Sequence, residues 1–112
     1  SNYYQMIIGV AYLHVDSIDK AIFHLESIVM REKDTEHTHH YLGLAYREKG
    51  DLDKSIFHLE KAIEMGISPK IDIYHADLAA VLESEYQYKQ AAHHFEKAHA
   101  ISICITKTKA LR

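Results

Sequence analysis

Histidine is the residue type in this sequence that could most readily carry out chemistry. The chain contains 10 histidines, and imidazole is the commonest metal ligand in proteins. Two Glu-x-x-His motifs, Glu36 to His39 and Glu96 to His99, have the spacing that di-iron helical bundles use for their ligands. Such a centre also needs two more carboxylates at the same point, and these motifs stand in different predicted hairpins. We therefore expect no metal site.

A second set of histidines recurs along the chain but is equally unsuited to a shared metal ion. His24, His58 and His94 would lie on successive helical hairpins about 10 Å apart, the spacing of packed helices. A single ion cannot bridge that distance, because its ligands lie about 2 Å away. The simplest origin of their recurrence is that the repeats share a template, and histidines are most simply solvated surface residues. Three glutamates that recur in the same way, Glu26, Glu60 and Glu96, are expected to form a solvated stripe.

Signatures of other catalytic chemistry are also absent from the sequence. Nothing resembling a protease or hydrolase motif surrounds Cys104, and no glycine-rich loop precedes a predicted helix. Asp51 and Asp53 begin like a calcium loop, but the loop's glycine and closing glutamate are missing. Two carboxylates at a helix start account for this pair. We therefore expect no enzymatic activity and no cofactor.

The composition favours one small helical domain without a nucleic-acid partner. The chain has 112 residues, enough for one core, and its 4 glycines and 1 proline leave few helix breakers. The net charge is -3 with no basic cluster, whereas phosphate binding needs Lys and Arg gathered on one face. If most histidines are exposed, acidification from about pH 7.5 to about pH 5.5 would make the net charge positive.

No targeting or membrane signal in the sequence fixes a compartment. No apolar run approaches the roughly 18 residues of a membrane span, so we expect no membrane insertion. The opening Ser1-Asn2 resembles the scar of a cleaved tag, and both chain ends fall within periodic sequence. We therefore expect an excised piece of a longer protein. Its compartment stays open, with the cytoplasm favoured and the periplasm allowed if an upstream signal was removed.

An internal repeat organises the whole chain. One segment recurs at residues 21–26 (AIFHLE), 55–60 (SIFHLE) and, more faintly, 91–96 (AAHHFE). A second segment precedes each copy, at residues 8–12 (IGVAY), 42–46 (LGLAY) and 78–82 (LAAVL). The first two copies are about 34 residues apart, and the third follows with about two residues inserted.

Each copy is predicted to form two amphipathic helices joined by a short turn, because apolar residues return at intervals of three and four. The expected helices lie near residues 3–14, 18–31, 37–48, 52–65, 70–84 and 88–101, and a seventh could start near Thr106. Gly50 stands where a left-handed helix stop is needed, and Asp51 can cap the following helix. Gly66 can end the next helix, after which Ser68 and Pro69 can start another.

Small residues recur at the positions where the two helices of each pair should cross. Helices approach closely only where side chains are short. The small positions are Gly9, Gly43 and Ala79 in the first helices and Ala21, Ser55 and Ala91 in the second helices. The space around them would be filled by larger residues: Tyr12, Tyr46, Leu82, Leu25, Leu59 and Phe95.

These repeats resemble the tetratricopeptide repeat family over nearly the whole chain, and the middle copy, with Leu42-Gly43 and Tyr46, fits best. The tryptophan position of the family holds Gln5, His39 and His75 instead. The resemblance implies an all-α fold, a right-handed α-solenoid of three antiparallel helix-turn-helix repeats. Residues 1–112 would form one domain with repeats at about 2–35, 36–71 and 72–105, and 106–112 would be a cap or the start of a fourth repeat.

The resemblance also implies a concave groove, lined by the first helix of each hairpin, that holds a peptide or a partner helix. Carried onto this chain, the groove residues are Met6, Val10, Leu13, His37, His40, Tyr41, Leu44, Arg47, Ala76, Asp77, Ala80 and Glu83. Some members of the family grip a C-terminal carboxylate with Lys, Arg and Asn at such positions. Here Asp77 would repel it, so an apolar or helical segment fits better.

The first predicted helix is apolar on nearly all sides, and such a helix is normally buried on all sides. An upstream repeat is its expected cover in a longer chain, because the end repeats of solenoids normally carry a polar outer face. In the isolated chain, Tyr3, Ile7 and Val10 would form an association face for a homodimer.

Together these patterns predict a non-catalytic module whose concave groove binds a protein or peptide partner. One alternative is a spacer or oligomerisation arm of a larger protein. Another is a metal-dependent sensor that uses the histidines, although no metal ligand set is predicted.

Overall fold

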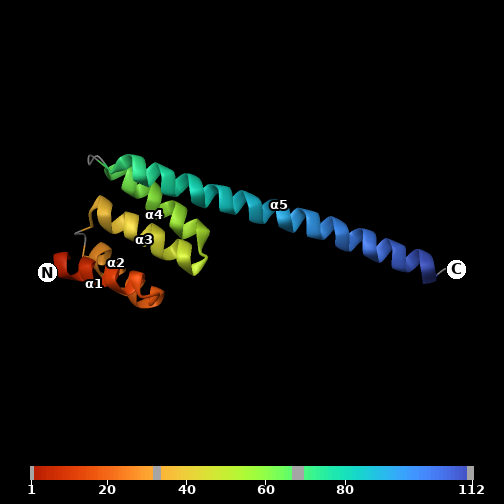
Figure 1. Ribbon diagram of the computed structural model, residues 1–112, viewed down its shortest axis with the longest axis horizontal. Helices are drawn as coiled ribbons and strands as arrows, with labels where there is room; N and C mark the ends of the chain where they lie inside the picture. Colours follow the sequence, from red (N-terminus) through yellow and green to blue (C-terminus); the bar gives the residue numbers. More distant parts are fainter. Residues whose placement is uncertain (1, 32–33, 67–69, 111–112) are drawn as a thin grey trace. The chain divides into compact units, whose positions relative to one another are not determined.

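The computed structural model describes residues 2–31, 34–66 and 70–110, all of whose regular structure is helical. The helices are α1 (Asn2–His14), α2 (Ile18–Met30), α3 (Glu36–Lys49), α4 (Leu52–Met65) and α5 (Ile71–Ala110) (Figure 1). The chain divides into two compact units, Ser1–Leu82 and Glu83–Arg112. In the part of the chain described, no helix combines the length and the apolar character needed to cross a bilayer. The predicted all-helical fold is confirmed.

The turns between the first four helices follow from local sequence. Gly50 adopts φ +90° and ends α3 with hydrogen bonds from the Gly50 and Asp51 amides back to the carbonyls of Arg47 and Tyr46. The Asp51 side chain then accepts the Lys54 amide at 3.2 Å and caps α4. Both roles confirm the predicted stop and cap, because glycine reaches positive φ without the steric penalty that a Cβ imposes.

The remaining predicted boundaries agree to within about one residue up to the end of α4. Gly66 ends α4 as expected, although its backbone is extended (φ -69°, ψ 119°) and not left-handed. Ser68 and Pro69, the predicted start of the following helix, lie outside the described residues.

The first unit is built on two antiparallel hairpins, α1 with α2 and α3 with α4, joined by packing of α2 on α3. At the crossing of the first hairpin, a Cβ added to Gly9 would lie 2.8 Å from Leu25 Cγ. At the second crossing, a Cβ on Gly43 would lie 2.6 Å from Leu59 Cγ. Both leucines are fully buried, so the glycines permit the close helix approach expected from the repeat.

The third predicted hairpin is wrong in one respect: its two helices form the single helix α5, with no turn near residues 85–87. Those positions hold Glu, Tyr and Gln, so neither a glycine nor a proline interrupts the helix. The helix also runs past Thr106, where a separate seventh helix was expected. Leu82, expected to fill the third crossing, is 45 % exposed, while the side chain of Phe95 lies outside the described set.

Candidate functional site

α3 has one buried face and one half-exposed face, and the half-exposed face carries the middle part of the predicted groove. The buried face includes Thr38, Leu42 and Ala45, each at most 1 % exposed. The half-exposed face, called the groove face from here on, consists of His37, His40, Tyr41, Leu44 and Arg47. α3 therefore retains an accessible face although both α2 and α4 pack against it.

Asp77 of α5 lies beside two cationic or protonatable groups of α3. His40 Nε2 donates to Asp77 Oδ2 at 2.7 Å, and Arg47 Nη1 lies 3.9 Å from Asp77 Oδ1. The positive charge of Arg47 therefore balances the negative charge of Asp77. The sequence led us to expect that Asp77 would repel a partner carboxylate, and this pairing weakens that repulsion. The Arg47 side chain is 36 % exposed, and its ionic contacts with the described residues Glu48 and Asp77 are long, at 3.7 and 3.9 Å, so its N–H groups retain hydrogen-bonding capacity.

A second polar link between α3 and α5 involves His37. The Tyr74 hydroxyl lies 3.2 Å from His37 Nδ1, and the His37 ring is also 3.7 Å from a carboxylate oxygen of Glu36. Tyr74 is fully buried, and its ring lies 4.7 Å from that of His40, centroid to centroid. The side of the groove face nearest α5 is therefore polar and held by side-chain contacts within the first unit.

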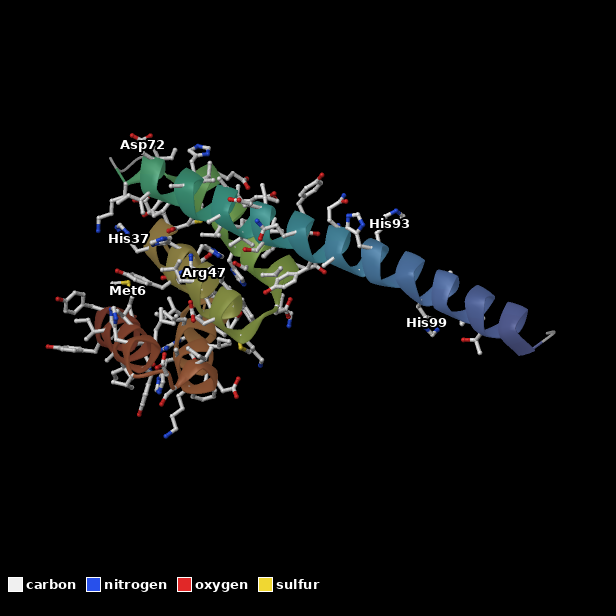
Figure 2. The ribbon with its side chains drawn as sticks, turned by 45° about the vertical axis from the view of Figure 1, so that its right-hand side comes forward. Met6, His37, Arg47, Asp72, His93 and His99 are labelled. Carbon is white, nitrogen blue, oxygen red and sulfur yellow. The ribbon has the colours of Figure 1, made fainter. Side chains whose placement is uncertain are left out.

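The other predicted groove residues of the first unit differ in burial. Met6 packs on the core cluster of Leu25, Leu42 and Tyr46, and Val10 and Leu13 are half-buried, so α1 contributes an apolar end as expected. Figure 2 shows Met6 on α1, with His37 and Arg47 on α3. Ala76 and Ala80 of α5 are exposed, and Glu83 belongs to the second unit.

The predicted association face on α1 is accessible. Tyr3 is 63 % exposed and Ile7 is 43 % exposed, whereas Val10 is half-buried. The neighbouring Tyr4 and Ile8 are also exposed, so the face continues around the helix. Apolar side chains gathered in this way favour contact with another surface.

A buried polar network, which the sequence did not reveal, lies between α2, α3 and α4. His39 Nδ1 and His58 Nδ1 are 3.0 Å apart, and His39 Nε2 lies 2.6 Å from Asp34 Oδ2. On the other side, His58 Nε2 lies 3.5 Å from Glu26 Oε1, which also accepts the Tyr46 hydroxyl at 3.0 Å. Side chains from three helices and the α2–α3 connection therefore form one chain of polar contacts.

Burial and hydrogen bonding shift the pKa values of three groups in this network. The pKa of His58 is lowered chiefly by burial, which disfavours the charged imidazolium. The hydrogen bond from His39 lowers the pKa of Asp34. Burial, together with the hydrogen bond to Glu26, raises the pKa of Tyr46 to about 12. The two Nδ1 atoms of the histidine pair need one donor and one acceptor, which agrees with a neutral His58.

Two of these positions correct the expectations of solvated surface histidines and of a solvated glutamate stripe. His58 is 6 % exposed and stacks on Tyr46, with ring centroids 5.5 Å apart, and Glu26 is half-buried and hydrogen-bonded. Glu60 is exposed, as expected for a solvated residue. His94 is exposed too, so residues at one repeat position differ in burial from hairpin to hairpin.

The missed signal is a constant separation of 19 residues between the family's tryptophan position and the recurring histidine. Gln5 Oε1 lies 2.8 Å from His24 Nδ1 in the first hairpin, which matches the His39–His58 contact in the second. The network is therefore a variation on a contact that both hairpins share. Among the described side chains, no group of three or more His, Cys, Asp or Glu could hold a metal ion.

Comparison with known proteins gives a family match for the α3–α4 hairpin, whose first helix carries the groove face. Residues 37–66, which contain nearly all of α3 and α4, match the family model of the tetratricopeptide repeat. No curated protein and no solved structure gave a significant match. Repeats of this type stack to form concave surfaces, and they typically serve in protein–protein interaction without catalysis. The α3–α4 hairpin is therefore similar to one tetratricopeptide repeat, in agreement with the resemblance noted in the sequence.

Proposed function

We propose that this chain is a non-catalytic module that binds a protein partner along the half-exposed face of α3. The observation that carries this proposal is the contrast between the two faces of α3. Thr38, Leu42 and Ala45 are buried, whereas Leu44 and Arg47 remain half-exposed although helices pack on both sides of α3.

The chemistry of the groove face favours a partner segment that is apolar or helical. Leu44 offers apolar surface on α3, and the half-buried Val10 and Leu13 extend that character onto α1. Arg47 provides the one guanidinium of the predicted groove set and can donate hydrogen bonds to an acceptor of the partner. A helix that places apolar side chains at intervals of three and four would meet such a surface.

Selection of binding peptides from a displayed library, followed by affinity measurement on variants, tests the proposal. Leu44→Glu and Arg47→Ala should each weaken binding by roughly tenfold or more, the effect expected for central interface residues. Leu52→Glu and Arg31→Ala are matched controls, because Leu52 is also half-buried and Arg31 is exposed at the end of α2. Controls that weaken binding as much as the groove variants, with helicity intact in all four, would contradict the proposal.

Oligomerisation through α1 is a second candidate function, and the exposed Tyr3 and Ile7 favour it. Replacing Ile7 and Val10 with asparagine should then dissociate a dimer measured by light scattering over a concentration series. A monomer at every concentration in the unsubstituted chain would rule this association out.

A further inference from the structure

The first two hairpins share a small-residue crossing that is closed by their own second helix. Gly9 faces Leu25, and Gly43 faces Leu59, with both glycines buried. Ser55 strengthens the second crossing, because its hydroxyl donates to the Gly43 carbonyl at 2.7 Å. In both hairpins, this face of the first helix is therefore inaccessible to any other chain.

The same crossing carries a polar pair in both hairpins. Gln5 meets His24 at 2.8 Å, and His39 meets His58 at 3.0 Å. Each pair joins the first helix of a hairpin to its second helix across 19 residues of sequence. The repeat thus specifies both a packing contact and a hydrogen bond at one place.

On α5 the corresponding face is exposed. His75 stands at the position of His39, Ala79 at that of Gly43, and Leu82 at that of Tyr46. All three are exposed, and Leu82 retains 45 % of its surface. By contrast, Tyr74 and Val81 are fully buried, so the early part of α5 has a buried side, and His75, Ala79 and Leu82 lie outside it.

The residues suited to cover this face lie further along α5 and are themselves exposed. Ala91 stands at the position of Ser55, which is fully buried, and His94 stands at that of His58, which is 6 % exposed. Both Ala91 and His94 are exposed in α5. His75 and His94 are also 19 residues apart, the separation of the polar pairs in the first two hairpins.

The turn that would bring these faces together within one chain lacks suitable residues. Asp16 and Gly50, at equivalent positions, both adopt positive φ, at 59° and 90°. Tyr86 takes their place in the third copy and is helical. A bulky aromatic residue rarely adopts the left-handed conformation, whereas glycine and aspartate do so far more readily. Gln87, which follows, is also a poor substitute for Asp51 as a helix cap.

We propose that two copies of this chain exchange the C-terminal part of α5, so that residues 91–104 of each copy cover the exposed α5 face of the other. Ile71–Ala110 is one helix, with no turn at residues 85–87 where the first two hairpins turn. A second copy supplies Ala91 and His94, which are spaced as Ser55 and His58 are in the second hairpin, and it receives the same contact in return. Such reciprocal exchange gives a closed, two-fold symmetric dimer. The proposal is independent of the α3 groove.

Light scattering of the chain across a concentration series, alongside a variant with a restored turn, tests this exchange. The unsubstituted chain should be a dimer. Tyr86→Gly combined with Gln87→Asp copies the Gly50-Asp51 turn and should give a monomer of undiminished helicity. The matched control, Tyr88→Gly with Lys89→Asp, places the same residues two positions later, out of register with the turn, and should remain a dimer. A monomeric unsubstituted chain, or a turn variant as dimeric as the control, would overturn the proposal.

Cysteine cross-linking identifies which chain supplies the cover. With Cys104→Ser removing the native thiol, Ala79→Cys and Ala91→Cys place thiols at the positions of Gly43 and Ser55. Under mild oxidation we expect a covalent dimer on a non-reducing gel. Introducing Tyr86→Gly with Gln87→Asp in the same chain should convert this product to an internally linked monomer. An internally linked monomer without the turn substitutions would show that each chain covers its own face, which would overturn the exchange. The dimer should persist when Ile7→Asn and Val10→Asn are introduced together, because the proposed contact lies on α5 and not on α1. Dissociation by these two substitutions would place the dimer contact on α1 and overturn the proposal.

Discussion

Substitution of Gly43 by alanine tests the close crossing of α3 and α4. The new Cβ would lie 2.6 Å from Leu59 Cγ and 2.8 Å from Leu59 Cδ2. Ordinary carbon contacts lie at about 3.5 to 4.0 Å, so the helices or the leucine must move by about 1 Å. Overpacking of this kind costs about 1 to 3 kcal/mol, and full burial of Leu59 places it towards the upper end.

Alanine also gains about 1 kcal/mol over glycine in helix propensity. The expected net effect of Gly43→Ala is therefore a loss of about 1 to 2 kcal/mol in the free energy of unfolding. For a domain of this size, each kcal/mol corresponds to about 4 to 8 °C in the melting temperature. Urea unfolding followed by circular dichroism measures the change.

Leu59→Ala completes a double-mutant cycle. Without the leucine the steric conflict disappears, so Gly43→Ala should stabilise the Leu59→Ala chain by about 1 kcal/mol. The coupling energy between the two positions should then be about 2 to 3 kcal/mol. If Gly43→Ala stabilises both chains equally, the close approach of α3 and α4 at this point is refuted.

Three further predictions concern single contacts in the first unit. Because burial lowers the pKa of His58 below 6.5, protonation favours the unfolded chain, so stability should fall as pH drops below about 6.5. His58→Gln should show a smaller loss between about pH 7.5 and pH 5.5 in urea titrations, and an equal loss would contradict the assignment. Asp34 has a lowered pKa, so its contribution is lost only as pH falls below 3.8 and does not affect that comparison. Gly50→Ala meets no atom within 4 Å but must keep φ +90°, and the resulting strain should cost about 1 kcal/mol in thermal unfolding; an unchanged melting temperature would count against the left-handed stop. Ser55→Ala should cost about 1 to 2 kcal/mol, because it leaves the buried Gly43 carbonyl without the 2.7 Å hydrogen bond, and denaturant unfolding would detect this loss.

Local sequence was sufficient to predict the first four helices and their crossings. Helix periodicity, the Gly50 stop and the Asp51 cap act over a few residues, so their effects can be read without knowing the rest of the fold. The glycine positions of the repeat likewise indicated where helices approach. The groove face of α3 followed from the resemblance to tetratricopeptide repeats, and its proposed partner binding stays a prediction.

Tertiary structure alone decided which histidines are buried. His58 and His94 share a repeat position, yet only His58 lies under a neighbouring helix. The pairing of Asp77 with Arg47 and His40 joins residues of α3 and α5 that no local pattern connects. At Tyr86, the repeat pattern predicts a turn while the residue type favours helix, and α5 shows that the residue type prevails. Burial and long-range pairing depend on neighbours distant in sequence, whereas helix stops and caps depend on a few adjacent residues.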